Sequence, residues 1–466
     1  MNTSVHFHGP CALVWQAEEV LLIRRPFPLR ASLTGLGVLL FASALWLPRA
    51  AGRARPPEPA DTAPPAMPDG PTDLRSGTCT PGPGYTDRGD DFVERLLRSE
   101  PQRFREILDN AESLRAQILV SEVVRDADGR PCIRSYGYRL NTEYFYPASA
   151  IKTVAAVASL LTFQEHAQAA DAVTRALFVR PRTARMINGE EAQTNRGRSN
   201  STLAAELERT LIVSSNRGFN VLFDIAGMEA QNQLMWRAGL RSVRMQHRLE
   251  VGDLHMDSHR FAPTVRLGRG RSAETVVPER TASVRFRNAL MLDMPRTGVG
   301  EAHINTDNGQ RIEHPLDFRR KNYISLRDLQ RIVLEVVDPS LDGGDVDLPL
   351  SDANRALLRD IMSRRPPAAR RGTVDDAEAR FEPLIPGINR VLPRDAYEYV
   401  NKAGRAWGFH LESAYVHRLD SDRAFFVAAT LYVDRDGLMN DNRADYDRIS
   451  FPFWVNLGEV LARELL

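Results

Sequence analysis

Apolar and polar positions alternate along the chain after residue 90 in patterns that predict helices and strands. Apolar residues recur at helical spacing over residues 91–114. Two strand-like runs, 117–124 and 132–139, are joined by turn residues and predict a hairpin. Residues 148–163 are apolar almost all round, which is typical of a buried helix.

The remaining pattern predicts more helices and then an antiparallel set of strands. Helical spacing returns at 202–211, at 325–336 with Ser325 as a cap, and at 451–466, whereas strand patterns occupy 397–402, 411–417 and 424–433. We therefore expect an α/β fold of the α+β type, with an antiparallel sheet flanked by helices.

The N-terminal part reads as a targeting segment. Arginines precede an uncharged, mostly apolar run at 31–47, and small residues follow it, which favours an export signal or an uncleaved membrane tether. A buried helix fits less well because a proline-rich stretch comes next. We expect an export signal or signal anchor at 1–52, a linker at 53–90 and one domain at 91–466, enlarged at about 238–321. The protein is then periplasmic or otherwise extracytoplasmic.

Composition excludes several function classes. The formal net charge is +1 with both signs interleaved, so nothing favours nucleic acid as a partner. The arginine-rich run at 265–271 is either a solvated loop or a site for an anion. The 10 histidines show no metal-ligand spacing, and no metal or cofactor is expected. Cys79 and Cys132 can form one disulfide, but their pairing stays open.

Lysine usage gives the strongest chemical signal. The chain has 61 lysines and arginines, yet its lysines are only Lys152, Lys321 and Lys402. Arginine serves equally well as a solvated charge, but only lysine loses its proton at accessible pH. Lys152 ends the S-x-x-K motif that begins at Ser149, and Lys402 begins a K-A-G motif.

These motifs predict a serine nucleophile activated by an amine. On a helix, Ser149 and Lys152 lie one turn apart, so the amine can take the hydroxyl proton. An S-x-N motif at 214–216 lies between the two lysine motifs. The alternative for Lys152 is a structural lysine whose amine reaches solvent from the first helical turn.

The order of the three motifs resembles that of class A β-lactamases and penicillin-binding proteins, over roughly residues 114–466. The resemblance implies a five-stranded antiparallel sheet and an all-helical subdomain that meet at the active site. It also implies a role for each motif residue: Ser149 as acylated nucleophile, Lys152 as its base, Ser214 as proton shuttle, Asn216 and Lys402 as substrate contacts, and Gly404-Arg405 as the pocket edge. We expect the backbone N–H groups of Ser149 and Arg405 to form an oxyanion hole.

Three departures from that pattern bear on turnover. Ala403 stands where the motif usually has a hydroxyl residue, and Ser215 replaces a common aspartate. The interval from Asn216 to Lys402 is much longer than in a compact class A enzyme. The extra length falls where a deacylating glutamate belongs, and Glu313 is the candidate base, with an ordinary surface glutamate as the alternative.

Two classes of function remain. The first is an exported, monomeric serine hydrolase that acts on a β-lactam or a cell-wall-derived amide or ester, with a D,D-peptidase as its variant. The second is a catalytically inert protein of the same fold that binds peptidoglycan or another partner. The retained lysines favour the enzyme, because a binding protein can use arginine at both positions.

Overall fold

The structure is a computed structural model whose described residues all fall within Pro59–Leu466. The described ranges are 63–66, 79–166, 177–179, 201–250, 253–268, 273–306, 308–366 and 380–466. The predicted export signal or anchor at 1–52 lies outside them. Across the described residues, every helix is too short or too polar to cross a lipid bilayer.

An antiparallel sheet with the order β12-β14-β15-β1-β2 forms the centre of the domain. A sixth strand, β13, also pairs with β14. The backbone leaves regular strand geometry at Lys402 and Ala403, which divides the outer position of the predicted five-stranded sheet into β12 and β13. The strands are β1 (Gln117–Arg125), β2 (Pro131–Tyr138), β12 (Tyr397–Asn401), β13 (Gly404–Ala406), β14 (Phe409–Arg418) and β15 (Ala424–Tyr432).

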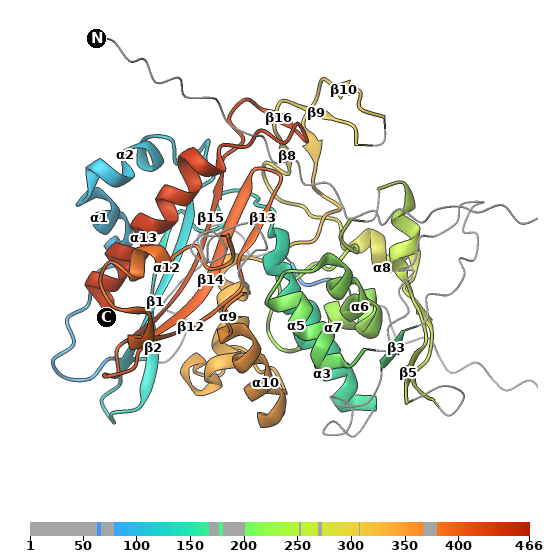
Figure 1. Cartoon of the computed structure of the whole chain (residues 1–466), viewed down its shortest axis with the longest axis horizontal. Coiled ribbons are helices and arrows are strands. Elements are labelled where there is room, and N and C mark those ends of the chain that lie inside the picture. The colour runs from blue at the N-terminus through green and yellow to red at the C-terminus, as the bar shows by residue number, and fades with distance from the viewer. Residues whose placement is uncertain are drawn as a thin grey trace, which may run out of the picture. The chain divides into compact units, whose positions relative to one another are not determined.

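Helices cover both faces of this sheet, and Figure 1 shows α13 lying against it on one side with α9 and α10 on the other. Successive side chains of a strand point to opposite faces. Accordingly, Phe425 and Val427 belong to the core under α13, whereas Phe426 belongs to the core on the opposite face. The covering helices are α1 (Phe92–Arg98), α2 (Pro101–Asp109), α12 (Ile385–Ile388) and α13 (Phe451–Leu465) on the first face, and α9 (Leu326–Val337) and α10 (Asp352–Ser363) on the second.

A separate group of helices forms the predicted helical subdomain. Its central helix, α3, buries every side chain from Lys152 to Phe163, as its all-apolar sequence predicts. Thr202 and Ser325 cap the helices that follow them by accepting hydrogen bonds from backbone N–H groups. The subdomain comprises the 3₁₀ turn η1 (Ala148–Ile151) and the helices α3 (Lys152–His166), α5 (Leu203–Leu211), α6 (Asn216–Ala226) and α7 (Met228–Arg237).

In the described part of the enlarged region at 238–321, the regular elements are short strands, the helix α8 and the 3₁₀ helix η2 (Asp253–Arg260). The strands pair as β3-β5-β6, β4-β7, β8-β11 and β10-β9-β16, in which β3 comes from before this region and β16 from the C-terminal part of the chain. Their bounds are β3 (Leu177–Val179), β4 (Phe261–Ala262), β5 (Val265–Leu267), β6 (Glu274–Val277), β7 (Arg280–Thr281), α8 (Val284–Ala289), β8 (Gly298–Val299), β9 (Ala302–Ile304), β10 (Arg311–Ile312), β11 (Leu316–Asp317) and β16 (Leu438–Met439).

Two boundaries differ from the sequence prediction. The single helix expected at 91–114 is two helices, because Pro101 has no N–H to continue α1 and instead begins α2. The folded part also begins within the predicted linker. Cys79 and Cys132 form a disulfide, and Arg88 binds Glu122 on β1 at 2.9 Å. The covalent link to β2 and this ion pair hold residues 79–90 on the sheet.

Candidate active site

The first motif lies where η1 passes into α3. Ser149 is in the 3₁₀ turn and Lys152 is the first residue of the helix. In a 3₁₀ turn, residues three apart lie directly above one another. Lys152 Nζ is therefore 2.9 Å from Ser149 Oγ, and the predicted pairing of hydroxyl and amine is present.

Lys152 is completely buried, and its polar contacts are all uncharged. Besides Ser149, the amine contacts Asn216 Oδ1 at 2.6 Å and both the hydroxyl and the carbonyl oxygen of Ser214. Burial, together with the positive charge of Lys402, holds the pKa of Lys152 well below its usual value, against a smaller opposing effect of Glu250. A neutral amine donates two protons, which the two carbonyl-type oxygens can accept. Its lone pair is then free to take the Ser149 proton.

Ser214 supplies a hydroxyl between the two amines. Its Oγ is 3.1 Å from Lys152 Nζ and 3.1 Å from Lys402 Nζ. The residue has a φ of 57°, and Ala148, just before the nucleophile, has a φ of 46°. Left-handed backbone is uncommon for residues other than glycine and is concentrated at functional sites. Ser149 therefore directly follows a residue with strained backbone, and Ser214 has strained backbone itself. The hydroxyl of each serine contacts the Lys152 amine.

The third residue of the S-x-N motif opens α6. Asn216 is the first residue of that helix, and Ser215 caps it by accepting a hydrogen bond from Gly218 N at 3.1 Å. Serine and aspartate serve equally well as helix caps. The cap explains why Ser215 can replace the usual aspartate, and it fixes Asn216 beside Lys152.

Lys402 reaches the site from the break between β12 and β13. Its backbone N–H donates to Ser413 O at 3.0 Å, and its amine is 3.1 Å from Ala403 O as well as from Ser214 Oγ. Burial lowers the pKa of Lys402 to about 8, although the nearby carboxyl of Glu412 opposes that shift. Burial raises the pKa of Glu412 to about 8 as well.

Gly404 brings strand β13 against the nucleophile. A Cβ on this residue would lie 2.6 Å from Pro147 O, 2.7 Å from Ala150 N and 2.9 Å from Ser149 N. These atoms belong to the backbone of η1 and its preceding residue, so the close approach requires glycine.

The register of β13 determines the direction of the Arg405 N–H. Ala406 and Phe409 flank a two-residue turn and form its hydrogen-bonded pair. Arg405 and His410 are therefore a pair without mutual hydrogen bonds, and the Arg405 N–H points away from β14. Strand β13 approaches the backbone of Ser149 at Gly404, the residue before this N–H. The Arg405 side chain instead packs between the rings of Tyr446 and Phe451, 5.1 Å from each, so its contribution to the site is its backbone.

Glu313, the sequence-based candidate for the hydrolytic base, lies elsewhere. It follows β10, its side chain is 73% exposed, and its carboxylate pairs with Arg311 at 2.8 Å. The described contacts of Glu313 involve none of the motif residues. The structure brings together the seven other predicted residues. Glu313 is an ordinary surface glutamate, which was the alternative for this residue.

A different carboxylate, Glu250, interacts electrostatically with Lys152 and is not identified by the sequence motifs. The residues just before it, 245–249, have irregular backbone and are held by asparagine side chains. Asn232 bonds both the N–H and the C=O of Met245, and Asn220 does the same at Leu249. Glu250 follows with an exposed side chain and a φ of 56°. The sequence feature that could have indicated Glu250 is Asn220, four residues after Asn216. Its side chain holds the backbone at Leu249, directly before Glu250.

The third lysine also belongs to this part of the molecule. Lys321 is 94% buried, with its amine 5.0 Å from the centre of the Trp407 ring. Trp407 forms the β13–β14 turn and packs against Tyr146, which leads into the S-x-x-K motif. Lys321 therefore lies beside the turn that connects β13 with β14.

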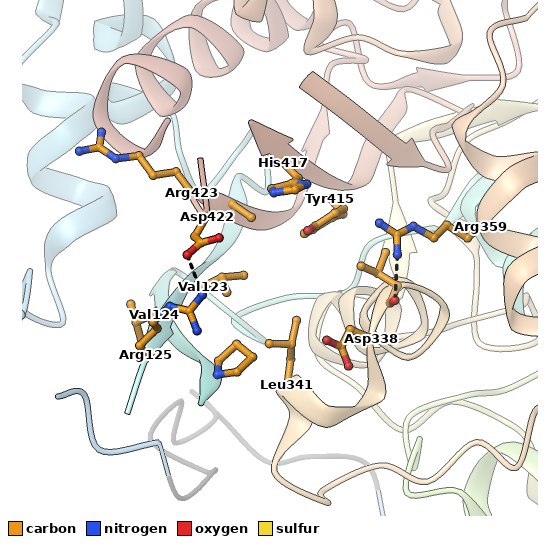
Figure 2. A pocket seen from close by; sticks show the side chains of 13 residues that line it. Val123, Val124, Arg125, Asp338, Leu341, Arg359, Tyr415, His417, Asp422 and Arg423 are labelled. Carbon is orange, nitrogen blue, oxygen red and sulfur yellow. Dashed lines mark hydrogen bonds and ion pairs between the residues drawn. The ribbon is translucent and has the colours of Figure 1, made fainter. Parts of the chain in front are cut away.

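A cavity of about 500 Å³ lies at the other end of the sheet and is distinct from this site (Figure 2). Tyr415 and His417, late in β14, line it together with Arg359 of α10 and the residues 422–424 that lead into β15. Lys402 and Gly404 pair with the earlier part of β14. The motif chemistry is thus not found in this cavity.

Comparisons with known proteins return β-lactamases and penicillin-binding proteins among solved structures. An acyl-enzyme complex of a PBP-A point mutant with penicillin G is 16% identical, covers 80% of this chain and 96% of its own, and has a TM-score of 0.44. A β-lactamase from Burkholderia vietnamiensis is 13% identical, covers 82% and 97%, and has a TM-score of 0.42. A β-lactamase from Streptomyces albus G is 14% identical, covers 80% of this chain and 100% of its own, and has a TM-score of 0.39.

No protein-family model and no curated protein sequence matches the chain. The predicted fold class is confirmed by the structure itself, in which helices flank an antiparallel sheet.

Proposed function

We propose that this chain is an exported serine hydrolase that forms an acyl-enzyme on Ser149 with a β-lactam or a cell-wall-derived amide or ester. The contact that supports this most is the 2.9 Å approach of the buried Lys152 amine to Ser149 Oγ. A structural lysine would reach solvent or a carboxylate, whereas this one contacts two hydroxyls and two carbonyl-type oxygens.

The proposed acylation follows from these contacts. Ser149 Oγ attacks the substrate carbonyl carbon as its proton passes to Lys152 Nζ. The N–H groups of Ser149 and Arg405 stabilise the oxyanion. As the C–N bond breaks, a proton passes through Ser214 Oγ to the leaving nitrogen. Lys402 binds the substrate carboxylate, and an ester on Ser149 remains.

We expect release of the acyl group to be slow. Hydrolysis needs a base that activates water near the ester. Asn220 holds the backbone at Leu249, whose apolar side chain is buried. The carboxylate of the next residue, Glu250, is exposed. Ala403 also lacks the hydroxyl that would help bind a substrate carboxylate. An acyl adduct should therefore persist for minutes rather than milliseconds.

Stopped-flow measurement with a chromogenic cephalosporin tests this proposal, with Ser149→Ala as the control. One rapid burst equal to the enzyme concentration, followed by slow turnover, is expected. Turnover on the order of a thousand per second would instead indicate an efficient β-lactamase. No burst from folded protein would favour an inert binding protein.

A D,D-peptidase is the second candidate, and the exposure of Glu250 favours it, because such an enzyme does not need efficient hydrolysis of a β-lactam ester. Release of D-alanine from a synthetic peptide ending in two D-alanines distinguishes the two enzymes. The peptidase predicts peptide turnover faster than cephalosporin turnover, and the lactamase predicts the reverse.

A further inference from the structure

The loop that follows β15 is closed and tightly turned. Its base is held by a 2.7 Å hydrogen bond from Asp445 N to Val433 O. Gly437, Asn440 and Asn442 have φ values of 72°, 68° and 64°. Glycine and asparagine are the residues that adopt left-handed backbone most readily, so the sequence suits this sharp folding.

Three carboxylates converge inside the loop. One oxygen each from Asp434, Asp436 and Asp441 lies within 4.8 Å of the other two. Calcium binds oxygen ligands at 2.3–2.6 Å, so two ligands of one ion can be as much as about 5 Å apart. The backbone also orients two of these groups: Asp436 accepts a hydrogen bond from Leu438 N at 2.9 Å, and Asp441 accepts one from Arg443 N at 2.9 Å.

A buried carboxylate oxygen within the group supplies an independent observation. Asp434 is only 5% exposed, and its Oδ1 is buried without a hydrogen-bond partner among the described residues. Burying a carboxylate oxygen without a partner is costly unless a cation or a donor compensates. A cation held by Asp434 within this group would compensate for the burial of its carboxylate, whereas a solvated acidic loop would expose it.

The arginines in and near the loop do not neutralise this group in the part of the chain that the structure describes. Arg435 and Arg448 both direct their guanidinium groups to Glu106, at 3.2 Å and 3.0 Å. Arg448 has a second partner in Asp445, which lies outside the convergent group. The described ion pairs therefore leave the three carboxylates without a protein cation.

We propose that Asp434, Asp436 and Asp441 bind a calcium ion, with loop carbonyls and water completing its coordination. An all-oxygen site favours a hard cation over zinc or copper. Magnesium needs a near-ideal octahedron at 2.0–2.1 Å and keeps most of its water, whereas calcium accepts several carboxylates in irregular geometry. The sequence Asp434-Arg435-Asp436-Gly437 spaces oxygen ligands two residues apart before a glycine turn.

The proposed ion would fasten the loop to the strand beside Ser149. Asp434 packs so closely on Gly408 that a Cβ on the glycine would lie 2.5 Å from the Asp434 Cβ. Val433 N donates to Gly408 O at 2.7 Å, and Gly408 belongs to the turn that connects β13 with β14. On its other side the loop contributes β16, which pairs with β9 of the enlarged region (Figure 1). Calcium should therefore stabilise the fold whether or not the chain is an enzyme.

Terbium luminescence and thermal unfolding of the full chain test the proposal. After treatment with EDTA, Tb³⁺ should bind and be sensitised by aromatic residues such as Tyr432, and Ca²⁺ should displace it more strongly than Mg²⁺. We expect a dissociation constant for Ca²⁺ on the order of 0.1–1 mM. At about 5 mM Ca²⁺ the Tm should then rise by about 2–4 °C.

Matched variants connect the response to the three carboxylates. Asp434→Asn and Asp441→Asn should fold, because each removes mutual repulsion, but should lose the Tb³⁺ signal and the calcium-dependent rise in Tm. Asp128→Asn, in the exposed turn between β1 and β2, should keep both. An unchanged Tm and no Tb³⁺ signal in folded wild type would overturn the proposal. A response that persists in Asp434→Asn and Asp441→Asn, or equal displacement by Mg²⁺, would also overturn the calcium assignment.

Discussion

Gly404→Ala should disable acylation while leaving the protein folded. The added Cβ meets three backbone atoms at 2.6–2.9 Å, and ordinary contacts are longer, so β13 and η1 must separate by about 0.5 Å or more. The N–H groups of Ser149 and Arg405 lie on these two segments. Their separation removes at least one oxyanion donor from the 2.7–3.1 Å range that stabilisation requires.

Loss of one such donor costs about 10²–10³ in rate, or roughly 3–4 kcal/mol of the activation barrier. The assay is the rate of labelling by a fluorophosphonate, measured beside thermal unfolding. Gly82→Ala is a matched control, because its Cβ meets Asp126 O at 2.7 Å in the N-terminal segment linked to β2. Both variants should lose about 1–3 kcal/mol of stability through overpacking. Labelling of folded Gly404→Ala at the wild-type rate would refute the proposed oxyanion hole.

Three further predictions concern charge. Lys152→Arg should abolish labelling because arginine cannot shed a proton at accessible pH, whereas Lys402→Arg should reduce it only moderately; equal, small losses would show both lysines to be structural. Because the pKa of Lys402 is about 8, kcat/KM for a substrate with a carboxylate should fall as pH rises through about 8. Lys402→Arg should remove that fall. Labelling by an uncharged fluorophosphonate should not decline in this pH range. Because the Glu250 carboxylate is exposed, Glu250→Gln should change neither the formation nor the lifetime of a penicilloyl adduct, both measured by mass spectrometry over time; a longer lifetime in the variant would identify Glu250 as a hydrolytic base.

The motif residues could be predicted because their chemistry depends on short spacing. Ser149 and Lys152 are three apart, and a 3₁₀ turn brings such residues together as well as an α-helix does. Ser214 and Asn216 surround the start of α6, which has its own cap signal. Local periodicity likewise identified the hairpin, α3 and the paired strands of the C-terminal part.

What the sequence could not provide depends on long-range contacts. Glu313 is a candidate only through its place in a long interval, and position along a chain does not determine which segment reaches the lysines. Glu250 is placed by Asn220, whose two hydrogen bonds to Leu249 cross 29 residues of sequence. Asp434 reads as an ordinary turn residue until its burial is known. The break in the sheet at Lys402 is also a tertiary feature, since β12 and β13 share one partner strand.

Covalent modification of Ser149 tests the central claim most directly. The purified chain would be incubated with benzylpenicillin, a cephalosporin and a fluorophosphonate, then examined by intact-mass spectrometry and peptide mapping. The account predicts one adduct per chain, on the peptide containing Ser149, and none on Ser149→Ala. Folded protein that gives no adduct with any probe, or an adduct that persists in Ser149→Ala, would contradict it.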